Sequence, residues 1–544
     1  MVGKFMKLKI ILFIVAFFAT TAFGKVQDSK KNQDSKNVLF IYVDDFRPEI
    51  NGWGHSYIKT PNINRLVDSG ISFTNTFCQY ANSSPSRKSC LTGLSPESTG
   101  HLGHYGNYGK IMNHTTMPGY YHENGYYTLS YGKVYHTSSD DMKSWDLFFD
   151  VKYPNTREFA AKKRAVPWES YGLTKNKLID NPLERPAVEC EDLPLENYND
   201  YNICIEAIKG LEKNKDKKFF MAVGFRKPHL PYAAPKRFWD MYDRDSIELT
   251  SFRVAPIGGD SIVHQWSELA NYSYFTEHYR TKDYRNVQVN LEKAKELQHG
   301  YYACVSYIDF LIGKLLDKLD ELNLRKNTLI VLLGDHGYHL GEQQIWGKHS
   351  CFNLSTNVPL IISNPTAKQK GVKCEKFVES LDLYPTLAQL SGLPEPKNCD
   401  GKSFSVLFDN PNADGFDASF NQYQSFQPGK IKDYMGYAIH TKDFTYIEWQ
   451  DLTDNYKIVN RELYSVKINR IEHVNLVGLK QYEGIIKELS ERIRMKFTPY
   501  RAKYNKYNEL KKDFPKEKKN KSAQKISNKN KIKTAARVKA YNEN

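Results

Sequence analysis

The sequence predicts an α/β fold in which a large, mainly parallel sheet lies between helices, followed by a smaller C-terminal domain that contains an antiparallel sheet and a helix. Short, unbroken apolar runs such as residues 38–43 and 328–333 are typical of strands buried on both faces. Helical patterns lie between such runs, and strands that alternate with helices indicate a parallel sheet covered on both sides. Beyond about residue 430 the pattern changes to short strands around turn residues, which predicts the second domain.

The elements of the main domain follow one another along the chain. The strand candidates share a short apolar stretch and are residues 38–43, 219–224, 328–333 and 358–362. The helix candidates between them are residues 62–69, 291–322 and 381–391. Two segments, at about 140–215 and 230–290, are rich in Pro, Tyr and charge with little periodicity, so we expect long insertions that shape a substrate cleft.

The C-terminal domain is predicted from a hairpin. Residues 437–440 and 444–447 flank the turn-like run Thr441-Lys442-Asp443, which is typical of two antiparallel strands. A further strand pattern, Glu462-Leu463-Tyr464, precedes a helix that we expect from about 478 to 497. These patterns predict a main domain over 37–430 and a smaller domain over 431–500.

The two ends of the chain differ from the rest in composition. Lys4, Lys7 and Lys9 precede an apolar core at 10–18, and small residues at Ala22 and Gly24 suit cleavage, so residues 1–24 are predicted to be a signal peptide. The apolar run is short for a bilayer span, which argues against the alternative of a membrane anchor. A polar linker over 25–36 follows. We therefore expect an exported protein, periplasmic or secreted, without a stable membrane span.

Most of the net charge of +15 comes from the C-terminal tail. Residues 511–544 hold twelve Lys and Arg against three acidic residues, whereas the main part of the chain is close to balanced. The segment 501–544 therefore predicts a solvated, disordered tail, and retention on a polyanion is the alternative. With no recognition motif in an exported protein, we expect no nucleic-acid partner.

Eight cysteines form a sparse set with no C-x-x-C and no zinc-site spacing. Export permits disulfides, and Cys190–Cys204 or Cys374–Cys399 are possible pairs. Spacing alone does not decide the connectivity.

Two of the predicted strands end in residues that can bind a cation. Asp44 and Asp45 follow the first strand, and Asp335 and His336 follow the strand at 328–333 after one glycine. In open α/β sheets the carboxyl ends of strands form the sites. Aspartates at these ends also cap helices, but capping accounts for any one of them better than for three. The carboxylates suit Ca²⁺ or Mg²⁺.

A pentapeptide, Ser83-Ser84-Pro85-Ser86-Arg87, followed by Leu91-Thr92-Gly93, carries a resemblance to a known family. On its own such a run is also typical of a surface turn. It resembles the signature of type I sulfatases, in which the first residue is oxidised to formylglycine. Further matches to sulfatase landmarks occur in the expected order, over about 37–476, at residues 60–63, 70–75, 358–361 and 382–387. Residues 132–136, 225–231 and 346–350 resemble the subgroup of iduronate-2-sulfatase and its bacterial relatives.

The resemblance implies an alkaline-phosphatase-like catalytic domain and a role for each matched residue. Ser83, converted to formylglycine, would be the nucleophile, and one Ca²⁺ would be bound by Asp44, Asp45, Asp335, His336 and the modified Ser83. Arg87 would hydrogen-bond the hydrated formylglycine. Lys133 and Lys348 would hold the sulfate oxygens. His136 would contact the formylglycine hydroxyls, and His229 would protonate the leaving oxygen.

The activity implied is that of an exported sulfatase that hydrolyses the sulfate esters of a sulfated polysaccharide or its oligosaccharides, at the exposed end of the glycan. A Ser at position 83 also implies a maturation partner, a radical-SAM sulfatase maturase that acts before export. The alternatives are a phosphatase or phosphonate monoester hydrolase of the same superfamily, and a catalytically dead relative that binds glycans.

Overall fold

The computed structural model describes residues 36–101, 114–136, 141–150, 185–260, 262, 268–273, 289–425, 434–467 and 470–512. The predicted signal peptide at 1–24, nearly all of the linker and the tail beyond residue 512 lie outside the described residues, as do residues 151–184 of the first insertion and 274–288 of the second. Within the described part of the chain, no helix is both long enough and apolar enough to span a membrane.

The main sheet has eight strands and confirms the predicted fold class. Its strands, in spatial order, are β12 (Val372–Glu379), β2 (Ile71–Phe77), β11 (Asn357–Ser363), β8 (Thr328–Gly334), β1 (Asn37–Val43), β6 (Phe219–Phe225), β3 (Tyr127–Gly132) and β4 (Leu147–Phe149). All neighbouring strands are parallel except at β11, which runs antiparallel to both β8 and β2. The predicted strand at 358–362 is therefore present, but it is the one antiparallel member.

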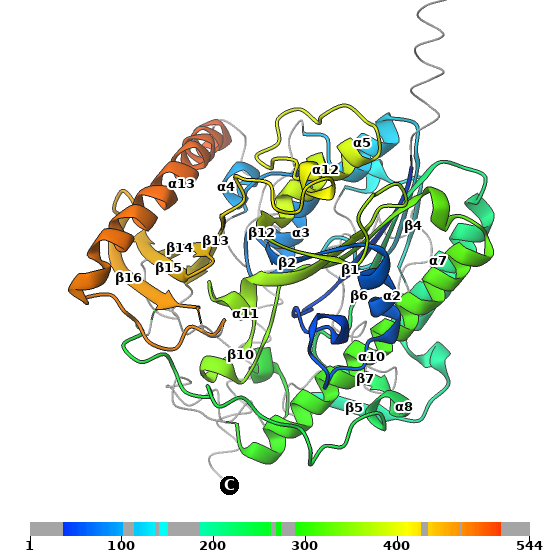
Figure 1. Ribbon diagram of the computed structural model, residues 1–544, viewed down its shortest axis with the longest axis horizontal. Helices are drawn as coiled ribbons and strands as arrows, with labels where there is room; N and C mark the ends of the chain where they lie inside the picture. The colour runs from blue at the N-terminus through cyan, green and yellow to red at the C-terminus, as the bar shows by residue number, and fades with distance from the viewer. Residues whose placement is uncertain are drawn as a thin grey trace, which may run out of the picture.

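Helices cover both faces of this sheet, because side chains along a strand alternate between the two faces. In β1, Leu39 and Ile41 belong to one buried cluster, whereas Phe40 and Tyr42 belong to another. The first cluster includes side chains of α2 (Pro61–Ser69), α7 (Asn199–Asn214) and α10 (Leu291–Glu321), and the second those of α3 (Ser83–Thr92), α5 (Met117–Glu123) and α12 (Leu383–Leu390) (Figure 1).

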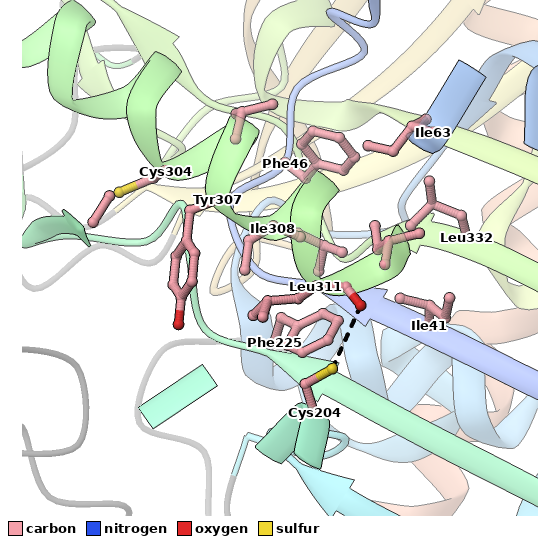
Figure 2. Packing of buried hydrophobic residues seen from close by; sticks show 14 of the residues in the cluster. Ile41, Phe46, Ile63, Cys204, Phe225, Cys304, Tyr307, Ile308, Leu311 and Leu332 are labelled. Atoms are coloured by element: carbon pink, nitrogen blue, oxygen red, sulfur yellow. Dashed lines mark hydrogen bonds between the residues drawn. The ribbon is translucent and has the colours of Figure 1, made fainter. Parts of the chain in front are cut away.

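Figure 2 shows part of the first cluster, where Ile308 and Leu311 of α10 pack beside Ile41 and Phe225. Here the Cys204 thiol of α7 donates to the carbonyl oxygen of Leu311 at 3.4 Å. Helix α7 lies in the last part of the segment at 140–215, which has little periodicity in the sequence and for which no helix was predicted.

The shorter elements of the main domain lie mostly around the ends of the strands. They are α4 (Pro96–Thr99), α8 (Lys236–Trp239), α11 (Asn353–Thr356), β5 (Val188–Glu191), β7 (Tyr232–Pro235), β9 (His339–Leu340) and β10 (Trp346–Gly347). All eight cysteines are free thiols, so neither of the two possible disulfides is formed here. Cys190 is exposed whereas Cys204 is buried in the helix layer.

The C-terminal domain is a four-stranded antiparallel sheet with one long helix packed on it. The strands are β13 (Ala418–Ser425), β14 (Tyr434–Thr441), β15 (Phe444–Asp451) and β16 (Lys457–Ser465), and the helix is α13 (Glu483–Lys512), at the left of Figure 1. The predicted hairpin is confirmed as β14 and β15, in which His440 pairs with Thr445.

The bounds of this domain differ from those expected. The sheet begins at Ala418, before residue 431, because β13 pairs along its whole length with β14. The helix continues to Lys512, beyond the expected end near 497, with Pro499 inside it. Proline usually ends or kinks a helix, so continuation of the helix through Pro499 is unusual.

Candidate active site

Two neighbouring parallel strands bring the acidic residues to one edge of the main sheet. In the register of β1 and β8, Val43 lies opposite Gly334, so the residues after each strand leave the sheet side by side. The backbone N–H of Asp45 donates to Oδ1 of Asp335 at 3.1 Å, and the positive φ of Asp45, 58°, turns the chain here. This is the carboxyl edge of the parallel strands, where sites form in open α/β sheets.

Asp44, Asp45, Asp335 and His336 form one buried group, here called the acidic cluster. Each residue offers one ligand atom, and these atoms all lie within 4.8 Å of one another. All four residues have 0% exposure. Three carboxylates so close together and out of water require positive charge nearby.

The chemistry of the acidic cluster fits a hard divalent cation. Oδ2 of Asp45 is buried and has no hydrogen-bond partner among the described residues. Burial raises the pKa of Asp45, and it raises the pKa of Asp335 to about 6. Carboxylate oxygens are the ligands that Ca²⁺ and Mg²⁺ prefer, whereas the imidazole of His336 is the less usual member. The residues present therefore fit the Ca²⁺ that the resemblance implies.

The predicted nucleophile lies in the acidic cluster. Ser83 is the first residue of α3, a fully buried helix, and Asn82 caps this helix by accepting from the N–H of Ser84 at 3.2 Å. The Ser83 hydroxyl donates to Oδ1 of Asp44 at 2.9 Å and lies 3.0 Å from Nε2 of His336. The start of α3 therefore delivers residue 83 to the point where β1 and β8 end.

Arg87 lies one helical turn after Ser83 and is fully buried. Its Nε donates to Oδ2 of Asp335 at 2.7 Å, and its Nη2 lies 3.4 Å from Oδ1 of Asp44. The guanidinium carbon also lies 4.4 Å from the centre of the Tyr42 ring. Although burial opposes its charge, Asp335 and Asp44 raise the pKa of Arg87. Arg87 thus orients two carboxylates of the acidic cluster, and its Nη1 also donates to the backbone carbonyl oxygens of Lys133 and Val134.

Two buried lysines supply further positive charge from different elements. Lys133 follows β3, and its Nζ forms an ion pair with Oδ2 of Asp44. Lys348 follows β10, and its Nζ donates to Oδ1 of Asp45 at 2.8 Å and to Oε1 of Glu268 at 2.9 Å. Although burial opposes the charge of Lys348, Asp45 and Glu268 raise its pKa. The Lys348 ammonium therefore stays charged beside the acidic cluster.

The two remaining predicted histidines are less deeply buried. Nδ1 of His229 lies 2.7 Å from the carbonyl oxygen of Leu230, which only accepts, so this nitrogen carries a proton. The other nitrogen, Nε2, lies 3.9 Å from Oε2 of Glu268. Nδ1 of His136 has no hydrogen-bond partner among the described residues. Burial, together with Lys133, lowers the pKa of His136 to about 3, so its ring is uncharged at neutral pH.

One residue of the site was not predicted. Glu268 begins η7 (Glu268–Asn271), in the second of the two insertions, and forms a second close group with Asp45 and His229. Although burial opposes its charge, Lys348 and His229 lower the pKa of Glu268, so it is ionised. No motif or strand pattern surrounds it in the sequence.

Comparison with family models gives two matches. The model described as Sulfatase matches residues 36–393, and the model described as N-sulphoglucosamine sulphohydrolase, C-terminal, matches residues 341–498. The first match covers more than half of the chain and spans Ser83 and the whole acidic cluster.

Several curated proteins are similar to this chain over most of their length. Iduronate 2-sulfatase of Mus musculus is 31% identical over 528 residues, which cover 84% of this chain and 93% of that protein. A protein named Sulfatase from Formosa agariphila is 29% identical over 450 residues, which cover 78% of this chain and 81% of that protein.

Solved structures match at lower identity and support the fold. Phosphonate monoester hydrolase of Agrobacterium radiobacter matches with a TM-score of 0.67 at 18% identity, covering 86% of this chain and 96% of that one. A protein solved in complex with its substrate D-glucosamine-2-N,6-O-disulfate matches with a TM-score of 0.64 at 20% identity, covering 89% and 100%. The alkaline-phosphatase-like fold predicted from the sequence is thereby confirmed. The family model and the similarity to iduronate 2-sulfatase go further than the fold, and they show that the chain belongs to the sulfatase family and is a sulfuric ester hydrolase.

Proposed function

We propose that the chain is an exported sulfatase that removes sulfate from a sulfated glycan, using formylglycine made from Ser83 and a Ca²⁺ ion held by the acidic cluster. The observation that carries the proposal is the position of the Ser83 hydroxyl. It lies 2.9 Å from Asp44 and 3.0 Å from His336, at the centre of the carboxylates and lysines. A serine in an ordinary surface turn is exposed to water, whereas the Ser83 hydroxyl is buried next to charged side chains, where burial is costly unless the hydroxyl is hydrogen-bonded.

The Ca²⁺ ion and the formylglycine would each supply one kind of chemistry. A Ca²⁺ held by Asp44, Asp45, Asp335 and His336 would stabilise negative charge at the sulfate. Formylglycine at position 83, once hydrated, would supply a hydroxyl group as the nucleophile.

The side chains of the chain itself perform the other tasks. Lys133 and Lys348 would bind sulfate oxygens, and the buried position of each ammonium beside a carboxylate of the acidic cluster supports this role. His229 holds a proton at Nδ1 and has Nε2 on the side of Glu268. A second proton, taken up at Nε2 to give the imidazolium, would be the one that His229 passes to the departing sugar oxygen. Arg87 fixes the orientation of Asp335 and Asp44.

The substrate class rests on the named relatives. One is called iduronate 2-sulfatase, and one structural neighbour was solved with a sulfated glucosamine as its substrate. We therefore infer that the substrate is a sulfated sugar at the exposed end of a glycan chain. The predicted signal peptide supports export, and the Ser at position 83 supports dependence on a radical-SAM maturase.

The proposal is tested by replacing the nucleophile. When the chain is produced together with a sulfatase maturase, we expect Ser83→Ala to lower kcat for a sulfated substrate by at least about a thousandfold, because no nucleophile forms. Mass spectrometry of the peptide around residue 83 of the unmutated protein should show the loss of two hydrogens. Turnover retained by Ser83→Ala would overturn the assignment of the nucleophile.

A pair of chromogenic substrates tests the type of ester. We expect the matured enzyme to hydrolyse 4-nitrophenyl sulfate in preference to 4-nitrophenyl phosphate and to phenyl phosphonate esters. A preference for the phosphorus esters would contradict the proposal in favour of a phosphatase or phosphonate monoester hydrolase. Failure to cleave any of the three by a fully oxidised protein would indicate a glycan-binding relative without activity.

A further inference from the structure

Glu268 contacts two residues of the site at once, although the matched sulfatase motifs do not include it. One carboxylate oxygen, Oε1, accepts from Nζ of Lys348 at 2.9 Å. The other, Oε2, lies 3.9 Å from Nε2 of His229. A single carboxylate therefore links one residue placed to bind sulfate with the residue placed to protonate the leaving oxygen.

The surroundings of Glu268 are those of the site and not of the surface. Its side chain is 16% exposed, and the side chains of His229 and Lys348 are 13% and 2% exposed. Oε2 is buried and makes no hydrogen bond with any described residue. A buried carboxylate oxygen without a partner is costly, so a group that enters the site is expected to complete its contacts.

The orientation of the imidazole makes this contact specific. Because Nδ1 of His229 is engaged by the carbonyl of Leu230 at 2.7 Å, the ring presents Nε2 to Glu268. The ligand atoms of Asp45, His229 and Glu268 lie within 4.8 Å of one another, so this side of the site adjoins the acidic cluster. Lys348 connects Glu268 to the acidic cluster, because its Nζ donates both to Asp45 and to Glu268.

We propose that Glu268 is a positioning residue, whose carboxylate fixes Lys348 through Oε1 and, through Oε2 at 3.9 Å, favours the orientation and the protonated form of the Nε2 edge of His229. This inference rests on the proposed function, in which His229 is the acid. As the bond between sulfur and the sugar oxygen breaks, its electron pair stays on that oxygen, which takes the second proton of a His229 imidazolium from Nε2 and leaves the neutral ring protonated at Nδ1. Glu268 touches neither sulfur nor the leaving oxygen and acts through its two neighbours.

The test uses two sulfate esters that differ in their need for an acid. A sugar or alkyl sulfate releases a poor leaving group and depends on protonation, whereas 4-nitrophenyl sulfate releases a good leaving group and depends on it little. For Glu268→Gln we expect kcat/KM to fall about a hundredfold with the sugar sulfate and less than about fivefold with the aryl sulfate. The protein is the full chain, matured and loaded with Ca²⁺.

Three further variants separate positioning from folding. Glu268→Asp keeps the carboxylate and should recover part of the activity on the sugar sulfate. Glu248→Gln, an exposed residue in the same segment, is the matched control and should behave as the unmutated enzyme. In a His229→Ala background, Glu268→Gln should no longer alter the ratio of the two activities, since the acid through which it acts is gone.

The outcomes are distinct. Equal losses on both esters would overturn the link from Glu268 to His229, because they would show an effect through Lys348 alone, and no loss on either ester would overturn the positioning role altogether. A lower KM for Glu268→Gln at unchanged kcat would also overturn it, because the carboxylate would then merely occupy the place of the sulfate. An unmutated enzyme that carries formylglycine but cleaves neither sulfate would overturn the proposed function instead, and this inference with it.

Discussion

At the scale of single residues, charge balance decides the form of the site. Three carboxylates with 0% exposure are each matched by a cationic side chain: Asp335 by Arg87, Asp44 by Lys133 and Asp45 by Lys348. Breaking a buried ion pair by removing one partner costs roughly 3–5 kcal/mol, because the other charge is left alone. If the two lysines bind a sulfate as proposed, the carboxylates would need a replacement partner, and a divalent cation held by the acidic cluster would provide it.

This balance predicts the effect of Ca²⁺ on stability. We expect Ca²⁺ to raise the Tm of the chelator-treated, unmutated chain, since binding to the native state alone stabilises it. Asp45→Asn removes a ligand whose Oδ2 has no other partner among the described residues, so the Ca²⁺-dependent rise in Tm should be strongly reduced. Thermal denaturation across a Ca²⁺ titration measures both. Asp414→Asn, at an exposed position, is the control, and an undiminished rise in Asp45→Asn would contradict the assigned ligand set.

The same residues show what the sequence could predict about the site. Asp44, Asp45, Asp335 and His336 were predictable, because each pair directly follows an apolar strand and parallel strands end at one edge. Glu268 was not, because no apolar run or matched motif near it in the sequence ties it to the end of a strand. The contacts of Arg87 were also not predictable, since the motif fixes its spacing from Ser83 but not which carboxylates it reaches.

At the scale of elements, the direction of β11 and the length of α13 could not be predicted from the sequence, for physical reasons. An apolar run identifies a buried strand, but the path of the connecting chain sets its direction, and β11 enters between β2 and β8 antiparallel to both. Helix α13 continues past Pro499, where Tyr500 packs against the C-terminal cluster and Nη2 of Arg501 donates to Oε1 of Gln450 at 2.8 Å. Tertiary contacts of this kind override a local helix-breaking signal.

Helix α13 also packs against α4, and Glu97 of α4 is buried there. Both carboxylate oxygens of Glu97 are buried without a hydrogen-bond partner among the described residues. Burial raises the pKa of Glu97 from 4.5 to about 7. The carboxyl group is therefore protonated in the folded chain under mildly acidic conditions, where an unfolded chain has already released its proton.

This pKa predicts the pH dependence of stability at the α4–α13 contact. Because the folded pKa is raised, the stabilising effect of the protonated form is complete below pH 4.5, falls as the pH rises, and is lost above pH 7. The contribution of Glu97 to the free energy of unfolding changes by up to about 3 kcal/mol over this pH range. Glu97→Gln keeps the shape and cannot ionise, so its Tm should match the unmutated chain at pH 5 and exceed it at pH 8. The exposed Glu395→Gln should show no such trend, and a pH-independent difference for Glu97→Gln would contradict the prediction.

At the scale of the whole molecule, one buried carboxylate joins the C-terminal sheet to the site. Oε1 of Glu472 accepts from the backbone N–H of Asn353 at 2.8 Å, from its side-chain amide at 2.7 Å and from the hydroxyl of Thr445 at 3.0 Å. Oε2 accepts from the amide of Gln343 at 3.1 Å. Thr445 lies on β15, whereas Gln343 and Asn353 lie before and after Lys348 in the main domain.

Glu472 thus bonds the chain on both sides of Lys348, at Gln343 and at Asn353. Glu472→Ala leaves several buried donors without an acceptor, and we expect it to lower the free energy of unfolding by about 2–4 kcal/mol. Because small displacements of a binding group weaken catalysis, KM for a sulfate ester should also rise, about tenfold. Urea denaturation and steady-state kinetics measure the two effects, with the exposed Asp454→Ala as control. Reduced stability with an unchanged KM would show that the C-terminal sheet supports the fold without positioning Lys348, whereas both effects together would make this small domain a working part of the sulfatase site.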